Sequence, residues 1–176
     1  MDIIINDTIV CLKQGVQLMA KLSQELYVRT HTSCYDSTIG GHVRHNLDHF
    51  ISFQTGVPTG QVDYDARLRD ELLESDPDYA SGKMTNLITF LESLEPQQLA
   101  DTLKVKMDSG AAHEESPIWS DSSVQRELQF LISHTIHHYA LIATLCANEG
   151  MDLPKDFGVA PSTLRFRKSQ NAQCAR

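Results

Sequence analysis

Histidine is the residue most able to do chemistry in this chain, because six of its eight histidines fall in two tight groups. The groups are His42, His45 and His49, and then His134, His137 and His138. Neutral imidazole is the commonest protein ligand of transition-metal ions. Two such groups, far apart in the sequence, point to a metal site built by two separate elements.

The second group lies in a segment with helical periodicity. His134 and His138 are four residues apart, so on a helix both rings point towards the face that also carries Leu131 and Glu127. Two rings placed in this way can share one ion, at the Zn–N distance of about 2.0–2.1 Å found in zinc sites. His137 falls to the side of this face, and we expect it at the surface. A third ligand must come from another helix.

The first group can supply that ligand from any of its three members, which stack along one helix face beside an apolar stripe. Three neutral imidazoles leave a coordination position open to water, which is typical of reactive rather than closed structural sites. Nitrogen ligands suit zinc, nickel, iron or copper and do not choose among them. The alternative is a set of hydrogen-bonded core histidines, but burying several imidazoles without metal or partners is costly.

Two other kinds of catalysis fit the sequence poorly. Thr135 stands where the zinc-protease motif His-Glu-x-x-His has its glutamate, so a peptidase is excluded. Cys146 lies about three turns beyond His134 on an apolar helix, where a buried structural cysteine is expected rather than a nucleophile. Asp48 is a candidate hydrogen-bond partner for a ligand imidazole, although an aspartate on a helix is more often only solvated.

A further polar group lies in the long connection after the first histidines. It comprises Asp63, Tyr64, Asp65 and Arg67. Such a group is suited either to lining the mouth of a pocket or to holding the loop itself.

Composition narrows the class of protein. A chain of 176 residues is long enough for one domain with a hydrophobic core. Its net charge of −8 would repel nucleic acid, and it lacks the run of about 18 apolar residues that a membrane span needs. The acidic start does not match a secretory signal, and the four scattered cysteines suggest neither a disulfide framework nor a zinc ribbon. We therefore predict a cytoplasmic protein with no nucleic-acid or membrane partner.

Four amphipathic helices are predicted, over residues 7–27, from about 39 to 55, from about 77 to 95, and from about 124 to 147. Cap signals precede them at residues 6–8, 36–38, 75–77 and 122–123. A short hairpin is expected before the last helix, in which Leu103, Val105 and Met107 pair back on Ile118 and Trp119. The predicted fold class is all-α, an antiparallel four-helix bundle forming a single domain over residues 1–166 with a C-terminal strap. Residues 167–176 are expected to be a disordered tail.

The order of two motifs resembles the DinB/YfiT-like superfamily of four-helix-bundle metalloproteins. The motifs are residues 37–48, Ser-Thr-Ile-Gly-Gly-His-Val-Arg-His-Asn-Leu-Asp, and residues 134–138, His-Thr-Ile-His-His. The resemblance covers about residues 7–150. It implies that His45, rather than His42 or His49, joins His134 and His138 as a ligand of a divalent ion, zinc, nickel or iron. The extra histidines at positions 42, 49 and 137 depart from the family pattern.

The same resemblance implies a metal-dependent enzyme acting on a small molecule, with transfer of a low-molecular-weight thiol to an electrophile as the leading reaction. A hydrolase using the same three histidines is the alternative, and a non-catalytic protein in which the metal only stabilises the bundle is a third. Catalytic residues beyond the metal ligands are not indicated, so the choice between transferase and hydrolase stays open. Relatives and the spare helix faces are compatible with a homodimer.

Overall fold

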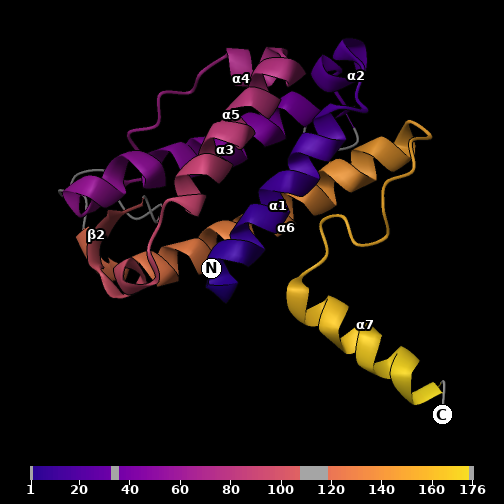
Figure 1. The fold of residues 1–176 in the computed structure, drawn as a ribbon. Helices are drawn as coiled ribbons and strands as arrows, with labels where there is room; N and C mark the ends of the chain where they lie inside the picture. Colours follow the sequence, from indigo (N-terminus) through magenta and orange to yellow (C-terminus); the bar gives the residue numbers. More distant parts are fainter. Residues whose placement is uncertain (1, 33–35, 108–118, 175–176) are drawn as a thin grey trace.

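The computed structural model describes residues 2–32, 36–107 and 119–174. Seven helices and three strands make up these described parts, joined by short 3-10 helices at Val57–Thr59 and Pro96–Ala100 (Figure 1). In chain order they are α1 (Ile3–Met19), α2 (Gln24–Val28), α3 (Ile39–Gly56), β1 (Gln61–Asp63), α4 (Leu72–Ser75), α5 (Pro77–Glu92), β2 (Thr102–Lys106), β3 (Trp119–Ser123), α6 (Val124–Asn148) and α7 (Pro161–Cys174).

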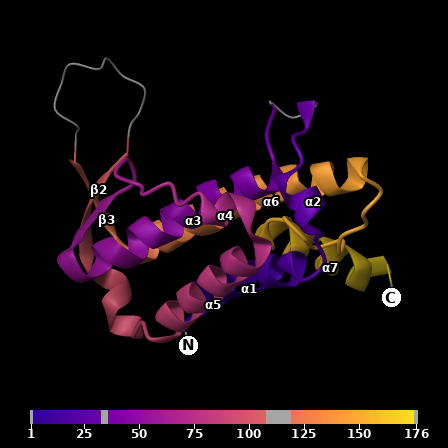
Figure 2. The same cartoon turned by 90° about the horizontal axis from the view of Figure 1, so that it is seen from above.

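The four longest helices that face the core pack in pairs, α1 against α5 and α6, and α3 against α5 and α6. Their apolar faces meet in one buried cluster to which every one of them contributes. The burial of these faces is the main force that holds α3 beside α6, and Figure 2 shows these two helices running along the length of the molecule.

Side-chain caps fix where three of these helices begin. Thr38 accepts a hydrogen bond from the N–H of Gly41, Asp76 from those of Asp78 and Tyr79, and Ser123 from that of Arg126. Each cap satisfies backbone donors that a helix start leaves unpaired. All three caps lie within the predicted cap segments.

The first predicted helix is wrong at both ends. Its cap is Asp2, whose side chain accepts from the N–H of Ile4, because the buried stripe already includes Ile5 and Ile9. The chain leaves the helix after Met19, and Ser23 caps a separate short helix, α2. A serine that can bond to the backbone competes with continued helix there.

The fold is not purely α-helical, because the structure contains a three-stranded mixed sheet in the order β1-β2-β3. β2 and β3 pair antiparallel, with Leu103 opposite Ser122, where the hairpin was expected; its connection, residues 108–118, and the predicted partner Ile118 lie outside the described residues. β1 pairs with β2 in parallel, with Val62 opposite Val105. The prediction of an all-α antiparallel four-helix bundle is therefore wrong.

A strand as short as β1 leaves no pattern in the sequence, since three residues cannot show an alternation of apolar and polar positions. The parallel pairing is set by tertiary structure: Gly60, at a φ of 71°, turns the chain after α3, and its carbonyl accepts from the N–H of Lys104. The N–H of Tyr64 then donates to the carbonyl of Lys106 at 2.9 Å. The sheet thus ties the connection after α3 to the strand that leads towards α6.

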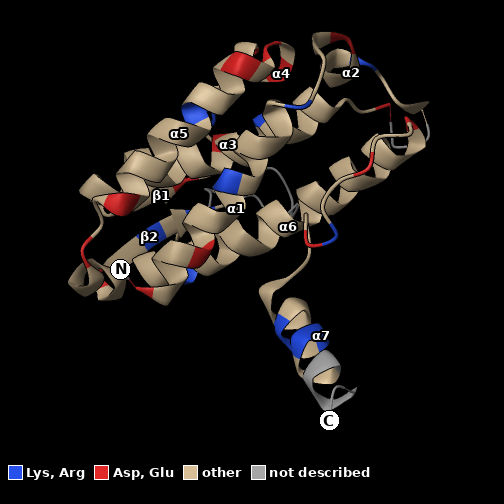
Figure 3. Cartoon of the chain, turned by 45° about the vertical axis from the view of Figure 1, so that its right-hand side comes forward, with Lys and Arg blue, Asp and Glu red and all other residues tan. Residues whose placement is uncertain are grey.

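The C-terminal part also differs from the prediction. An irregular strap to residue 166 and a disordered tail were expected, but Pro161–Cys174 forms α7. Figure 1 shows α7 apart from the other helices, and its Lys and Arg residues are not accompanied by acidic ones (Figure 3). α7 lies at the opposite end of the molecule from the sheet (Figure 2).

Candidate metal site

Three histidines from two helices meet between α3 and α6. One ring nitrogen each from His45, His134 and His138 lies within 4.8 Å of the other two. The ring centroids are 5.1 Å apart for His45 and His134, 4.8 Å for His45 and His138, and 4.6 Å for His134 and His138. In a tetrahedral zinc site two nitrogens lie roughly 3.3 Å apart. The ring nitrogens, which lie up to 4.8 Å apart, would have to approach one another to hold an ion in this way.

All three rings are neutral at pH 7. Burial, followed by the positive charges that neighbouring histidines would carry, lowers the pKa of His134 and of His138 to about 3. The same causes, with Arg67 and Arg44 added, lower the pKa of His45 to about 4. A metal ion needs the unprotonated imidazole, so the site holds its donors in the form that an ion requires.

One nitrogen of this cluster has no hydrogen-bond partner. Nε2 of His134 is buried and unpaired within the described residues. A buried polar atom left without a partner costs about 1–3 kcal/mol. A metal ion bound to this nitrogen would remove the cost. The unpaired nitrogen therefore favours a metal site over a core of hydrogen-bonded histidines.

His42 lies behind His138 and is suited to orient it. Nδ1 of His42 is 3.1 Å from Nδ1 of His138, and Nε2 of His42 is 3.0 Å from Oγ of Ser37. One assignment of hydrogens uses both contacts: Nδ1–H of His138 donates to His42, and Nε2–H of His42 donates to Ser37. That assignment leaves Nε2 of His138 with a lone pair for an ion, which is the usual arrangement around a ligand histidine.

His49 lies near the three rings, but its Nδ1 is engaged in a hydrogen bond to the backbone. Its Nδ1–H donates to the carbonyl of His45 at 2.8 Å, and its ring centroid is 4.3 Å from that of His134. His137 is exposed, as predicted. The sequence left three positions open for the third ligand, and the cluster contains His45. His42 and His49 lie next to the cluster but do not belong to it.

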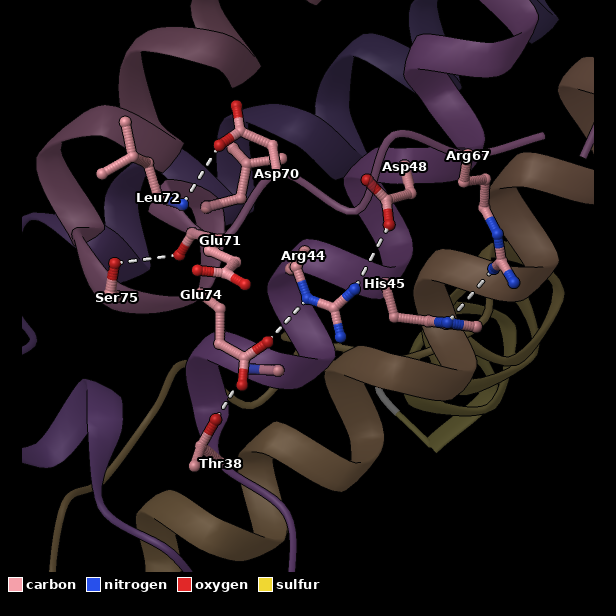
Figure 4. A network of polar contacts seen from close by, with 12 residues as sticks. Thr38, Arg44, His45, Asp48, Arg67, Asp70, Glu71, Leu72, Glu74 and Ser75 are labelled. Atoms are coloured by element: carbon pink, nitrogen blue, oxygen red, sulfur yellow. Dashed lines mark hydrogen bonds and ion pairs between the residues drawn. The ribbon is translucent and has the colours of Figure 1, made fainter. Parts of the chain in front are cut away.

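Arg67 is the residue whose place sequence reasoning did not foresee. Its Nη1 lies 3.3 Å from Nδ1 of His45 and 3.5 Å from Nε2 of His49 (Figure 4 shows the first contact). A guanidinium only donates, so Nδ1 of His45 accepts in this arrangement and Nε2 carries the hydrogen. An ion at Nε2 of His45 therefore requires Arg67 to move away.

Asp48 does not contact a ligand ring. It is 5% exposed, and an oxygen lies 3.6 Å from Nη1 of Arg44, whose Nε donates to Glu74 at 2.6 Å (Figure 4). Its predicted role beside an imidazole is wrong, because Arg44, one helical turn before it, takes the carboxylate.

The polar group around residue 64 mostly holds the connection in place. Tyr64 donates from its hydroxyl to Glu127 at 2.8 Å, and Ser122 donates to the other oxygen of Glu127 at 2.5 Å. Asp63 accepts from Lys106 and from the N–H of Asp65. The ring centroid of Tyr64 lies 5.4 Å from that of His49, so this network forms the wall of the site next to the sheet.

Cys146 is fully buried, and burial raises the pKa of its thiol to about 11. A thiol with that pKa stays protonated at neutral pH and is unreactive. The expectation of a structural cysteine agrees with this.

Comparison with known proteins gives one informative result. No protein-family model matches the chain. The chain is 34% identical over 130 residues to FK506-binding protein 5 of the fungus Rhizopus delemar. The aligned segment covers 70% of this chain and 33% of that protein. The chain thus spans about a third of the length of this relative.

This similarity overturns the function expected from the sequence. The relative is named an FK506-binding protein, and this finding contradicts the DinB-like metal-dependent thiol transferase, its hydrolase alternative and the metal-stabilised structural protein. The resemblance of the two histidine motifs was a likeness of short segments, and short segments do not carry a reaction with them. The superfamily resemblance itself stays a prediction.

Proposed function

We propose that His45, His134 and His138 hold a divalent transition-metal ion. The observation that carries the proposal is the convergence of three neutral imidazoles from α3 and α6 on one point, of which that of His138 is buried and the other two are partly buried. The unpaired Nε2 of His134 supports it. Zinc, nickel and iron all accept such ligands.

Each ligand has a neighbour that governs its donor atom. His42 keeps Nε2 of His138 free, and the apolar ring of Phe130, stacked on His134 at a centroid distance of 5.5 Å, restricts the orientation of His134. Arg67 has to leave His45 when an ion arrives. An ion held by three imidazoles keeps a position for one further small ligand.

Zinc titration of chelator-treated protein, followed by calorimetry, tests the proposal. We expect one ion per chain in the wild type, and a loss of affinity of about 100-fold or more in His134→Ala, since one of three ligands is gone. His137→Ala is the matched control, because it removes an exposed histidine from the same helix, and it should bind zinc like the wild type.

The same titration on His45→Ala and His49→Ala decides the third ligand. We expect a large loss in the first and a small one in the second. Equal zinc affinity in the wild type and in the His134 and His45 variants would contradict the proposal, provided that circular dichroism shows the variants folded.

The similarity to FK506-binding protein 5 favours a second candidate function, the binding of FK506. This chain aligns with only a third of the protein that carries this name. The binding of FK506 by this chain is therefore a proposal. Titration with FK506 under thermal denaturation is the direct test. A ligand that binds only the folded chain raises its melting temperature, and an unchanged melting temperature at saturating FK506 would rule this candidate out.

We propose a small-molecule ligand, no nucleic-acid or membrane partner, a cytoplasmic location and a homodimer. α6 is, among the described helices, long and apolar enough to cross a membrane, but 44% of the residues in its most apolar window are buried inside the fold. The core helix of a globular domain has the same character, which supports the proposal of no membrane partner.

A further inference from the structure

A groove lies beside the C-terminal half of α3. It is bounded by this part of the helix, by β1 and by the segment of residues 66–70. Its volume is about 410 Å³. Its walls combine apolar side chains with two cationic ones, and they include Ile51, Thr55, Ala66, Arg67, Leu68 and Lys83. A space of this size is in the range of small-molecule sites.

The acidic residues of the groove are already engaged. Asp63 accepts from Nζ of Lys106 at 2.9 Å, and Asp48 pairs with Arg44 at 3.6 Å. Asp70 accepts from the hydroxyl of Tyr79 at 2.8 Å. These carboxylates are therefore held by partners of their own.

The cations of the groove are not balanced in this way. Arg67 forms no ion pair within 4.0 Å among the described residues; its Nη1 faces ring nitrogens of His45 and His49, and its buried Nε has no hydrogen-bond partner. Lys83 lies with its Nζ 5.1 Å from the ring centroid of Tyr79. A guanidinium whose side-chain contacts are two ring nitrogens at 3.3 and 3.5 Å gains more from a carboxylate, with which it forms short charge-assisted hydrogen bonds.

The apolar part of the groove defines the rest of the ligand. Leu68 is 89% exposed at the rim, close to Ile51 and Ala66, which also line the groove. An exposed leucine beside a hollow offers apolar area that a ligand can cover. The nearby carboxylates of Asp48, Asp63 and Asp70 repel a doubly charged phosphate more strongly than a singly charged group.

We propose that this groove binds a small organic carboxylate, with its anionic group on Arg67 and a short apolar chain against Ile51, Ala66 and Leu68. The groove adjoins the proposed metal site, since Arg67 contacts His45, but its existence does not depend on the proposed metal binding. Carboxylate binding and metal binding would nevertheless favour each other, because a carboxylate draws Arg67 from Nδ1 of His45.

Hexanoate is a suitable probe, and the protein is kept in chelator so that failure of metal binding cannot affect the result. Backbone amide shifts in two-dimensional NMR locate the binding, and their titration gives the affinity. We expect shifts in residues 48–70 at about 10 mM hexanoate, and much weaker shifts with hexanamide, which has the same chain without the charge.

The decisive variant is Arg67→Gln, for which we expect affinity to fall by about tenfold or more. Arg69→Gln is the matched control, since it removes the same charge from the same segment at a residue that does not line the groove, and its affinity should stay within about twofold. Leu68→Ser should weaken hexanoate but not acetate. An absence of shifts in the wild type, or equal affinities in the Arg67 and Arg69 variants, would overturn the proposal, and stronger binding of inorganic phosphate than of hexanoate would overturn the carboxylate assignment.

Discussion

The histidine cluster should make the metal-free protein lose stability as the pH falls from 7 to 5. Folding lowers the pKa of His134 and His138 from 6.5 to about 3 and that of His45 from 6.5 to about 4. Between pH 6.5 and these values the unfolded chain binds more protons than the folded one. The free energy of unfolding therefore decreases as the pH falls through 6.5, and the loss levels off below the folded values.

The magnitude follows from these shifts. A histidine with an unfolded pKa of 6.5 that stays unprotonated in the fold loses about 2 kcal/mol of stabilisation between pH 7 and pH 5, as an upper limit. His45 and His134 are only partly buried, and solvent reduces the effect. We expect about 2–3 kcal/mol for the three residues together. Asp48 acts in the opposite direction, since burial raises the pKa of its carboxyl group and a raised carboxyl pKa adds stability as the pH falls.

Urea unfolding followed by circular dichroism at pH 5, 6 and 7, in the presence of chelator, measures this loss. His134→Leu should flatten the pH dependence, because it removes one of the histidines whose pKa folding lowers, whereas His137→Ala, at an exposed position of the same helix, should change the slope less. A free energy of unfolding that is the same at pH 5 and pH 7, or an unchanged slope in His134→Leu, would refute the account of buried neutral imidazoles.

Three further perturbations follow from particular contacts. Tyr64→Phe removes a hydrogen bond to the buried carboxylate of Glu127, and we expect a loss of about 1–3 kcal/mol in urea unfolding. His42→Ala should weaken zinc binding by about tenfold without changing the one-to-one stoichiometry, because it removes only the partner of a ligand, and His42→Gln should recover part of the affinity. Gly40→Ala should lower the melting temperature, since a methyl group there would collide with the backbone of α4, whereas Gly82→Ala meets open space on a helix and should raise stability by up to about 1 kcal/mol.

Local chemistry made much of the site predictable. The four-residue spacing of His134 and His138 placed both rings on the inner face of α6, and the caps at Thr38, Asp76 and Ser123 set where α3, α5 and α6 begin. These features depend on helix periodicity and on hydrogen bonds a few residues apart. Such information is present in any short stretch of the sequence.

Contacts between distant segments were not predictable in the same way. The pairing of β1 with β2 joins residues about forty positions apart through backbone groups, which every residue type carries. Arg67 could be identified as part of a polar group, but its approach to His45 depends on where that strand ends. The all-α prediction failed for the same reason, since helix periodicity gives no information on a three-residue strand.

The function was the part least accessible to sequence patterns. Short motifs around His45 and His134 suggested a thiol transferase or hydrolase, whereas the relative that is similar over 130 residues is named FK506-binding protein 5. Geometry supports an ion on these residues, but an ion alone does not define a reaction.

Because α7 lies apart from the other helices, the molecule has two regions of opposite net charge. Arg165, Arg167 and Lys168 give this helix a charge of +3 without an acidic residue, so the rest of a chain of net charge −8 carries −11. At low ionic strength both cation and anion exchangers would hold the protein, each by a different end, and added salt would release it from both as screening shortens the reach of these charges.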